Sequence, residues 1–285
     1  MKKYDVIIIG AGPAGLTAAI YALRAGKKVV VCEKELVGGV MNTADKIDNY
    51  PGFSSISGYE LSQNMYNHAK GLGAEFVYSN AVKADLKGEE KNVSLQNGEQ
   101  IAGNAVILAM GIWYKQLGLD NEVDLIGQGI SYCATCDGPF FKNKTVMVAG
   151  NASAKKDIEY LLSLVQKLYI VDLSKNEFLK IIKDEKIEYF SNCNITALNG
   201  KPLKSVNIDK KEIAVSGLFV AIGKSPNTNL VKGQVDLDDK GFIKVDNKFK
   251  TNLDNVFAVG DIASGTLKQV VSACASGAVA SLNLK

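Results

Sequence analysis

A glycine-rich turn placed between two apolar runs constrains the fold of this 285-residue chain more than any other feature. Val6–Ile9 is a continuous apolar run typical of a strand buried in a parallel sheet. The turn from Gly10 to Gly15 reads Gly-Ala-Gly-Pro-Ala-Gly, and it opens a predicted helix that ends near Ala25, before a second predicted strand at Val29–Cys32. Such glycines let the backbone approach a pyrophosphate, which lies at the partly positive N-terminus of the helix. The pattern predicts a dinucleotide-binding unit.

The same pattern occurs twice in the chain. In the first copy, Glu33 follows the second strand, 23 residues after Gly10, and can accept hydrogen bonds from a ribose. In the second copy, the predicted strand Thr145–Val148 leads into a turn at Ala149, and Asp172 follows 23 residues later. Two copies predict an α/β fold with two Rossmann-like, three-layer nucleotide-binding domains.

The C-terminal segment returns to the first domain. Val256–Val259 is a short predicted strand that leads into Asp261, and a predicted helix rich in Ala, Ser and Gly begins at Gln269. An acid after such a strand can bond the ribityl chain of a flavin, although Asp261 could also simply cap a turn. We therefore predict a first, FAD-binding domain in two pieces, residues 1–114 and 244–285, with a second domain of the pyridine-nucleotide type inserted at 115–243.

Composition excludes several classes of protein. Apolar residues make up 47% of the chain and charged residues 22%, as in a globular protein rather than a disordered one. The 33 basic and 30 acidic residues give a net charge of +3, too balanced for an electrostatic nucleic-acid binder. The apolar stretch Val6–Leu23 resembles a signal peptide or a membrane span, but its glycines and Pro13 interrupt it. With no other apolar run of that length, we expect a cytoplasmic protein without membrane contact.

Two of the five cysteines, Cys133 and Cys136, form a Cys-Ala-Thr-Cys sequence. Thiols separated by two residues can close a small disulfide, so that one attacks a substrate disulfide and the other resolves the mixed intermediate. In a reducing compartment such a pair is catalytic rather than structural. The pair could also be half of a zinc site, but His68 is the only histidine and the other thiols are isolated, so we predict no metal site. We expect small core roles for the remaining thiols, Cys32, Cys193 and Cys274.

These residues resemble the low-molecular-weight thioredoxin reductases, and the resemblance covers nearly the whole chain. Its most specific part is the run Ser131–Asp137, which reads Ser-Tyr-Cys-Ala-Thr-Cys-Asp. The other matching landmarks are the glycine turn, Gly38-Gly39, Asp48–Phe53, Ala109–Gly111, Gly223–Thr228 and Gly260-Asp261. The resemblance implies an enzyme that binds FAD, reduces thioredoxin, forms a homodimer and rotates one domain against the other.

The resemblance also implies roles for individual residues. Cys133 would attack thioredoxin, Cys136 would face the flavin, and Asp137 would protonate the leaving thiolate. For Trp113 and Tyr114, which lie at the domain hinge, we expect core packing rather than stacking on the flavin. The implied FAD-binding residues are Gly10, Gly12, Pro13, Ala14, Gly15, Glu33, Gly38, Gly39, Met41, Asn49, Val82, Met110, Gly111, Gly260, Asp261, Lys268 (where the family usually has arginine), Gln269 and Val270.

The chain departs from this family at the expected nicotinamide site. Ala149 and Asn151 replace two glycines of the second turn, and the Asn151 side chain stands where the backbone should approach a pyrophosphate. The family's two glutamates after this turn are Lys155 and Lys156 here. NADPH-dependent members carry a His-Arg-Arg run after the second strand, whereas Asp172–Glu177 contains no arginine. Asp172 would repel a 2′-phosphate, and although it could bond the 2′-hydroxyl of NADH, the altered turn spoils the site for either nucleotide. We predict that the second domain does not bind NADP(H).

Electrons must then reach the flavin from another donor. A flavin can accept electrons singly and pass them on as the pair that a dithiol requires, and the chain resembles in this respect the clostridial ferredoxin-dependent flavin thioredoxin reductases. A ferredoxin at about −400 mV can reduce a thioredoxin at about −270 mV. We therefore expect ferredoxin as the donor. The alternatives are an NAD(P)H-dependent thioredoxin reductase, a flavin dithiol oxidase and a flavin-binding redox sensor, the last disfavoured by the intact dithiol sequence.

Overall fold

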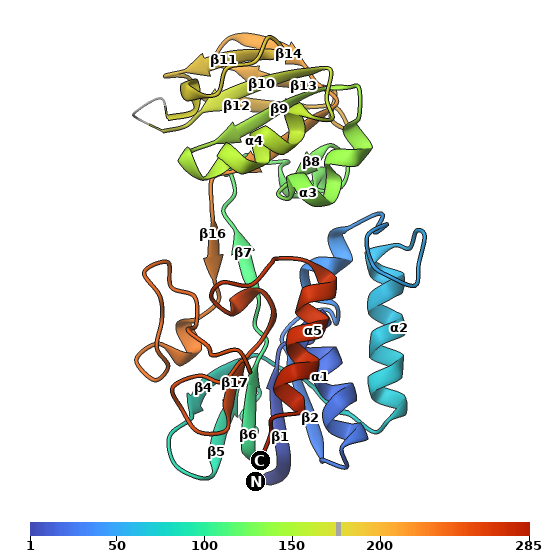
Figure 1. Cartoon of the computed structure of the whole chain (residues 1–285), viewed down its shortest axis with the longest axis vertical. Coiled ribbons are helices and arrows are strands. Elements are labelled where there is room, and N and C mark those ends of the chain that lie inside the picture. The colour runs from blue at the N-terminus through green and yellow to red at the C-terminus, as the bar shows by residue number, and fades with distance from the viewer. Residues whose placement is uncertain (175–177) are drawn as a thin grey trace. The chain divides into compact units, whose positions relative to one another are not determined.

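The computed structural model describes residues 1–174 and 178–285, and the chain divides into two compact units. Unit 1 comprises Met1–Trp113 and Ser225–Lys285, and unit 2 comprises Tyr114–Lys224 (Figure 1). The chain passes from one to the other twice, through β7 (Ile112–Tyr114) and β16 (Lys224–Pro226), which pair as a two-stranded sheet. Each unit has its own main sheet and its own hydrophobic core.

Unit 1 is built on a seven-stranded sheet with helices α1, α2 and α5 on one face (Figure 1). The strands lie in the order β3-β2-β1-β6-β5-β4, and β17 also pairs with β6. The strands β3, β2, β1, β6 and β17 run parallel, whereas β4 and β5 are antiparallel to their neighbours. The strands are β1 (Lys2–Ile9), β2 (Val29–Glu33), β3 (Glu75–Tyr78), β4 (Ala81–Asp85), β5 (Lys91–Leu95), β6 (Gln100–Leu108) and β17 (Val256–Ala258). The helices are α1 (Pro13–Arg24), α2 (Gly58–Gly71) and α5 (Val270–Ser281).

Small residues let helices α1 and α5 pack closely. Pro13 is the first residue of α1, where its fixed backbone angle suits a helix start. A Cβ atom on Gly277 of α5 would lie 2.2 Å from the carbonyl oxygen of Ala14, so a larger residue would force the helices apart. Ser281 Oγ donates a hydrogen bond to the carbonyl oxygen of Ala18 across the same contact, at 2.9 Å. This packing explains why the predicted C-terminal helix is rich in Ala, Ser and Gly.

Unit 2 has a parallel sheet and a smaller antiparallel one. The parallel sheet has the order β11-β10-β9-β15-β8, and β12, β13 and β14 form the antiparallel sheet. The strands are β8 (Ile130–Ser131), β9 (Thr145–Gly150), β10 (Lys167–Asp172), β11 (Ile187–Ser191), β12 (Ile195–Asn199), β13 (Ser205–Ile208), β14 (Lys211–Ala214) and β15 (Gly217–Ala221). The helices are α3 (Ala134–Asp137) and α4 (Lys155–Leu162). The predicted α/β class with two Rossmann-like units is therefore confirmed.

The second domain boundary lies earlier than the sequence analysis predicts. The prediction assigns residues 115–243 to the inserted domain, whereas unit 2 ends at Lys224. Residues 225–243 belong to unit 1 because Val231, Val235 and Ile243 are buried in its core together with Ile7 of β1. The first boundary, predicted after residue 114, lies after Trp113.

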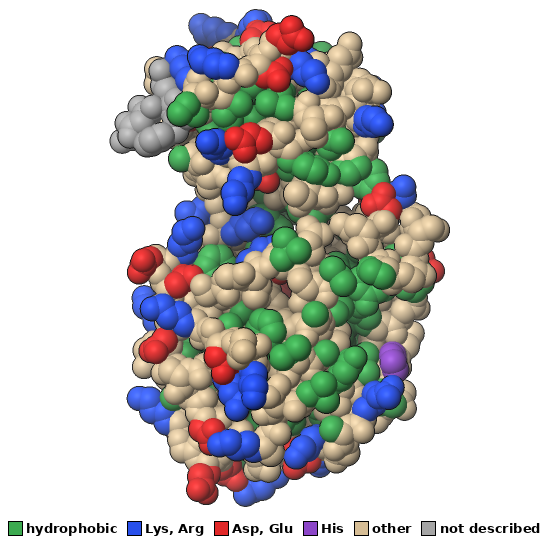
Figure 2. All heavy atoms as spheres, in the orientation of Figure 1, with side chains coloured by type: hydrophobic (Ala, Val, Ile, Leu, Met, Phe, Trp, Pro, Cys, Tyr) green, Lys and Arg blue, Asp and Glu red, His purple; other side chains and the backbone are tan. Residues whose placement is uncertain are grey.

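The distribution of surface charge and the lengths of the helices can be compared with what the composition predicts. On the face shown in Figure 2, acidic and basic side chains are interspersed over both units, as the balanced charge of the sequence implies. The apolar stretch Val6–Leu23 folds as parts of β1 and α1 joined by the glycine turn. In the part of the chain that the structure describes, no helix has the length and hydrophobicity needed to span a membrane.

Candidate active site

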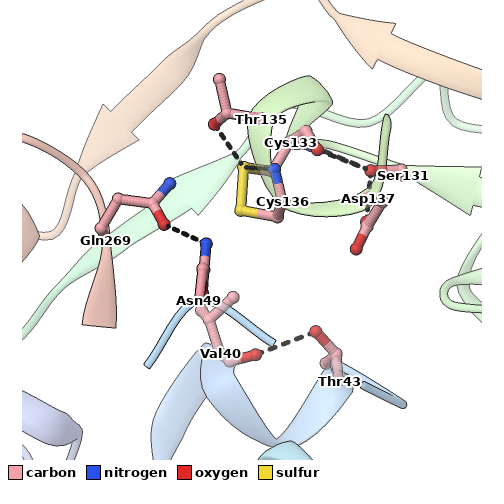
Figure 3. Close-up of a disulfide and its surroundings, with 9 residues drawn as sticks. All are labelled: Val40, Thr43, Asn49, Ser131, Cys133, Thr135, Cys136, Asp137 and Gln269. Atoms are coloured by element: carbon pink, nitrogen blue, oxygen red, sulfur yellow. Dashed lines mark hydrogen bonds between the residues drawn. A yellow bond between two sulfur atoms is a disulfide. The ribbon is translucent and has the colours of Figure 1, made fainter. Parts of the chain in front are cut away.

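Cys133 and Cys136 form a disulfide at the start of the short helix α3, with their Cα atoms 5.3 Å apart (Figure 3). Cys133 has extended backbone angles and is the N-cap of α3, so its Sγ accepts a hydrogen bond from the backbone N–H of Cys136 at 3.2 Å. The Thr135 hydroxyl lies 3.4 Å from the same sulfur. A sulfur at a helix N-terminus lies where the backbone dipoles favour negative charge, which stabilises a thiolate once the disulfide is reduced.

Asp137, the predicted proton donor, is held by Ser131 (Figure 3). The Ser131 hydroxyl donates to Asp137 Oδ2 at 2.5 Å and accepts the backbone N–H of Cys133 at 3.0 Å. Ser131 is buried at the end of β8, where it pairs with Phe219 of β15. One side chain fixed by the sheet thus contacts both the first cysteine and the acid, a role that the motif Ser131–Asp137 does not indicate by itself.

A buried acid, Glu122, contacts the residue that precedes the dithiol. Its carboxylate accepts backbone N–H groups of Leu117 and Gly118 at 2.9 and 2.8 Å, and the hydroxyl of Tyr132 at 2.6 Å. Burial, together with the hydrogen bond to Glu122, raises the pKa of Tyr132, so its hydroxyl stays protonated and remains a donor. No short motif includes Glu122, so its role could not be predicted from the sequence.

The glycine turn of unit 1 has two structural glycines and one that faces open space. A Cβ atom on Gly10 would lie 2.4 Å from the carbonyl oxygen of Ala109, and one on Gly15 would lie 2.0 Å from that of Gly10. By contrast, a Cβ atom on Gly12 would meet nothing within 4 Å. Gly12 is also the N-cap of α1, so the open space lies at the partly positive end of a helix. A pyrophosphate fits this position.

Glu33 and a neighbouring cavity fit the adenosine half of a dinucleotide. Glu33 Oε2 accepts the backbone N–H of Ala11 at 2.7 Å, and Oε1 accepts that of Glu35 at 3.0 Å, which fixes the carboxylate beside the glycine turn. Each carboxylate oxygen keeps a second lone pair for a ribose hydroxyl. The cavity has a volume of about 450 Å³ and is lined by Lys34, Glu35, Tyr78, Ser79, Asn80, Gln96 and Asn97. The predicted adenine contact Val82 is 54% exposed on β4.

The structure brings together further predicted FAD residues that are far apart in the sequence. Asn49 Nδ2 donates to Gln269 Oε1 at 3.1 Å (Figure 3). Gln269 is the N-cap of α5, whose first residue is Val270. Gly260 and Asp261 lie in a 3₁₀ turn, and the backbone N–H of Gly260 donates to Ser276 Oγ at 2.8 Å. The remaining predicted residues lie in or beside turns of unit 1: Gly38, Gly39, Met41, Met110 and Gly111.

Lys268 contacts its own loop. Its ammonium donates to the carbonyl oxygen of Asp261 at 2.6 Å, to that of Ala263 at 3.0 Å and to the hydroxyl of Thr266 at 2.8 Å. A lysine ammonium has three donors, so these contacts engage all of them. Lys268 therefore stabilises the loop that follows Asp261.

The corresponding turn of unit 2 is closed by its own side chains. Asn151 Oδ1 accepts the backbone N–H of Ser153 at 3.0 Å, and Asn151 Nδ2 donates to the carbonyl oxygen of Ile222 at 3.1 Å. Residues 152–154 form a 3₁₀ turn, and α4 begins only at Lys155. The N–H group of Ser153, which in an open turn would face a phosphate, is therefore engaged.

Asp172 is buried at the end of β10 and is also engaged. Its carboxylate accepts the backbone N–H of Ser174 and that of Leu179, each at 2.9 Å, as well as the Ser174 hydroxyl. The predicted arginine-free segment continues through residues 175–177, which lie outside the described residues.

Other predictions about side chains have mixed outcomes. Trp113 is 48% exposed, with Lys34 Nζ 4.2 Å from the centre of its ring, so the prediction that Trp113 packs in the core is wrong. Tyr114 is half-buried and stacks on Tyr132, with ring centres 5.3 Å apart. Cys32 is buried in a core as predicted. Within residues 1–174 and 178–285, no group of three or more His, Cys, Asp and Glu side chains is arranged to hold a metal ion.

A dithiol turn in one unit and a glycine cradle in the other define a disulfide oxidoreductase built on dinucleotide-binding folds. The family described as pyridine nucleotide-disulphide oxidoreductase matches residues 4–277. The thioredoxin reductase of Bacillus subtilis is 36% identical over 299 residues, covering 100% of this chain and 94% of that protein. That of Mycolicibacterium smegmatis is 38% identical over 296 residues, covering 98% and 95%. The chain therefore belongs to the pyridine nucleotide-disulphide oxidoreductases, and among them to the low-molecular-weight thioredoxin reductases.

Solved structures agree with this family. The thioredoxin reductase of Streptococcus pyogenes superposes with a TM-score of 0.93 at 31% identity, covering 99% of this chain and 97% of that one. A ferredoxin-flavin thioredoxin reductase from Clostridium acetobutylicum superposes with a TM-score of 0.57 at 32% identity, covering 100% and 97%. The two identities are nearly equal, so overall similarity does not single out the ferredoxin-dependent subtype that the sequence analysis expects.

Proposed function

We propose that this protein reduces thioredoxin through the Cys133–Cys136 dithiol, with FAD bound in unit 1. The observation that carries the proposal is the disulfide at the start of α3, beside the Ser131–Asp137 pair. Relatives called thioredoxin reductase that match over nearly the whole chain support thioredoxin as the substrate. The open space at Gly12 and the cavity beside Glu33 support FAD, and unit 1 is the proposed FAD domain.

The dithiol would act by two exchanges. Bound FAD supplies the electron pair that converts the Cys133–Cys136 disulfide to two thiols. The Cys133 thiolate attacks one sulfur of the thioredoxin disulfide, which forms a mixed disulfide and releases the other sulfur as a thiolate. Asp137 donates a proton to that leaving sulfur. The Cys136 thiolate then attacks Cys133 Sγ and re-forms the enzyme disulfide, so the second thioredoxin sulfur leaves as a thiolate and takes a proton from solvent, which received the protons of the two enzyme thiols. Two electrons and two protons pass to thioredoxin.

For the electron donor, we propose a ferredoxin rather than a nicotinamide. The main support is the closed turn of unit 2, where Asn151 engages the Ser153 N–H. In addition, Asp172 Oδ1 already accepts two hydrogen bonds from Ser174, so only Oδ2, which accepts the N–H of Leu179, keeps a lone pair. A nicotinamide dinucleotide needs both a phosphate turn and a free group for its ribose. The net charge of +3 favours, if weakly, an encounter with an acidic electron carrier.

A second donor is favoured by the comparisons. The matching family is described by its pyridine nucleotide, and the relatives from B. subtilis and M. smegmatis are called simply thioredoxin reductase. An NAD(P)H-dependent enzyme is therefore the second candidate, and it requires that Asn151 turn away from Ser153 when the nucleotide binds.

One anaerobic experiment separates the donors. The oxidised, FAD-loaded protein is mixed with millimolar NADPH, with NADH, or with reduced ferredoxin, and the flavin absorbance is followed. We expect little bleaching with either nicotinamide, and full bleaching followed by dithiol formation in thioredoxin when reduced ferredoxin is supplied. Raised ionic strength should slow the ferredoxin step, because screening reduces attraction between exposed charges. Rapid stoichiometric bleaching by NADPH or NADH would replace ferredoxin by the nicotinamide. Failure of all three donors, with reduction by a small dithiol and reoxidation by oxygen, would indicate a dithiol oxidase.

The variant Asn151→Gly gives this experiment a matched comparison. It removes the side chain that bonds Ser153 and Ile222 but leaves the dithiol turn unchanged. If the closed turn excludes the nucleotide, NADH should bleach the flavin of Asn151→Gly faster than that of the natural chain. The rate of flavin reduction by ferredoxin should be the same in both chains. Equal, slow bleaching of both chains would mean that Asp172 or another group excludes the nucleotide.

We also propose that the protein is a homodimer in the cytoplasm, as the family resemblance implies. A chain of 30.5 kDa should then give twice that mass by light scattering. A single-chain mass at micromolar concentration would contradict the dimer.

A further inference from the structure

The Ser131 hydroxyl lies in a position to serve two groups at once. Ser131 is only 3% exposed, and its backbone is fixed by the parallel pairing of β8 with β15. Its Oγ atom is 2.5 Å from Asp137 Oδ2 and 3.0 Å from the backbone nitrogen of Cys133. The carbonyl oxygen of Cys133 is also within reach, at 3.3 Å. A hydroxyl has one hydrogen to donate, and the shorter, charge-assisted contact with the carboxylate takes it.

These contacts couple Asp137 to Ser131. A hydrogen bond donated to a carboxylate favours its ionised form over its protonated form. The same hydroxyl accepts the N–H of Cys133, so the carboxylate is connected to the backbone of the attacking cysteine through a single oxygen atom. We propose that Ser131 is a positioning residue for disulfide exchange, which holds the Asp137 carboxylate against the Cys133 turn and sets the pH range in which Asp137 carries its proton. This inference rests on the proposed function.

Other titratable groups lie close enough to be considered. The Cys133 and Cys136 thiols are on the same turn. Helix α4, which packs against α3, carries Lys155, Lys156, Asp157, Glu159 and Tyr160. Burial raises the pKa of Asp157, against an opposing effect of Lys224. A change in pH dependence that requires both Ser131 and Asp137 distinguishes their pair from these groups.

The test uses enzyme that is reduced beforehand, so that its outcome does not depend on the electron donor. Stoichiometrically reduced, FAD-loaded protein is mixed with oxidised thioredoxin, and the single-turnover rate is measured between pH 5.5 and 9.5. Ser131→Ala should slow the exchange roughly tenfold at its best pH, because the acid loses the hydrogen bond that connects it to the Cys133 turn. The rate should fall at high pH as Asp137 loses its proton, and we call this fall the alkaline limb of the pH profile. Ser131→Ala should move the alkaline limb to a pH about one unit higher, since the ionised carboxylate loses a charge-assisted hydrogen bond.

Two matched variants make the result specific. Ser131→Thr keeps the hydroxyl and should restore the rate to within about threefold and the limb to its original pH. In an Asp137→Asn background, Ser131→Ala should change the rate by no more than about twofold, because the group through which it acts is absent. Thermal unfolding and flavin content verify that each variant is folded. Asp137→Asn alone should abolish the alkaline limb, and this measurement remains available if Ser131→Ala does not fold.

The outcomes separate this inference from the proposed function. If the reduced natural chain does not transfer its electrons to thioredoxin, the proposed function fails. If it does transfer them, but Ser131→Ala has the same pH profile as the natural chain, the positioning role is wrong. An equal loss of rate in the presence and absence of Asp137 would likewise overturn it, because Ser131 would then act on the Cys133 backbone alone.

Discussion

The hydroxyl of Tyr132 donates a hydrogen bond of 2.6 Å to the carboxylate of Glu122, and Tyr132 is the residue immediately before Cys133. Glu122 is only 1% exposed and accepts two further strong hydrogen bonds from the backbone of residues 117 and 118. Tyr132 also stacks on Tyr114, the first residue of unit 2. The dithiol turn is therefore connected through one tyrosine to the segment where the chain enters this unit.

The Glu122–Tyr132 pair should contribute measurably to the stability of unit 2. Tyr132→Phe should lower the free energy of unfolding by about 1–2 kcal/mol, because Glu122 loses one of its donors. Glu122→Ala should lower it by about 2–3 kcal/mol, since it leaves two partly buried N–H groups and the Tyr132 hydroxyl without their acceptor. Far-UV circular dichroism follows both units, whereas Trp113, the only tryptophan, reports on unit 1.

A matched control is Tyr160→Phe, which removes a hydroxyl elsewhere in unit 2. It should change stability by much less than Tyr132→Phe does. In the Glu122→Ala background, Tyr132→Phe should have almost no further effect, because the partner of its hydroxyl is gone. Additive losses would show that the two side chains do not act as a pair.

Gly12 and Gly15 of the first turn should respond differently to substitution. Gly12→Val should leave the fold of the flavin-free protein intact but reduce FAD occupancy at least about tenfold, because the new side chain fills the space at the helix N-terminus. Gly15→Ala should destabilise the fold itself, since its Cβ atom would lie 2.0 Å from the carbonyl oxygen of Gly10. Flavin released on denaturation gives the occupancy, and thermal unfolding of the flavin-free proteins gives the stability. Full flavin content in Gly12→Val would exclude this turn as the pyrophosphate site.

Replacing the two cysteines should separate their roles. Cys133→Ser should abolish thioredoxin reduction, because the attacking sulfur is lost, while dithionite still reduces the flavin. Cys136→Ser should instead retain the attacking thiol and accumulate a mixed disulfide with thioredoxin, since no sulfur is present to resolve it. Non-reducing gel electrophoresis and mass spectrometry detect this adduct. An adduct with Cys133→Ser in place of Cys136→Ser would reverse the assignment.

The buried thiol of Cys32 should make unit 1 less stable in alkali. Burial, with the charges of Glu99 and Glu33, raises the pKa of Cys32 from 9.0 to about 12. Between these pH values the unfolded chain loses the thiol proton and the folded chain keeps it, so the free energy of unfolding falls as pH rises above about 9. One proton contributes a slope of about 1.4 kcal/mol per pH unit. Denaturant unfolding followed by Trp113 fluorescence should show a shallower slope for Cys32→Ala, and parallel slopes would contradict the expectation.

Local sequence patterns predict the first unit well. The predicted strand Val6–Ile9, a helix to about Ala25 and a strand at Val29–Cys32 correspond to β1 (Lys2–Ile9), α1 (Pro13–Arg24) and β2 (Val29–Glu33). They are predictable because strand, turn and helix are adjacent in the chain and each has its own apolar period or glycine pattern. The Cys133–Cys136 disulfide is predictable for the same reason.

Contacts between distant segments cannot be obtained from such patterns. Residues 225–243 contain no strong period, and they join unit 1 only because Val231 and Val235 fill a core formed by other strands. Likewise, the position of Lys268 depends on three oxygen atoms of a folded loop, which a resemblance between sequences does not describe. Ser131 and Glu122 gain their roles from the strand and the turn that present them.

The chain leaves unit 1 through β7 and returns to it through β16, and this connectivity determines the order in which the two units can fold during synthesis. Unit 2 is one continuous stretch, so it can fold as soon as residues 114–224 have left the exit tunnel. Unit 1 cannot be completed at that point, because β17 and α5 have not been made and the surface of α1 that receives Gly277 is uncovered. The nascent chain therefore carries an exposed apolar surface until β17 and α5 are synthesised, and chaperone binding during translation should concentrate on the first 113 residues.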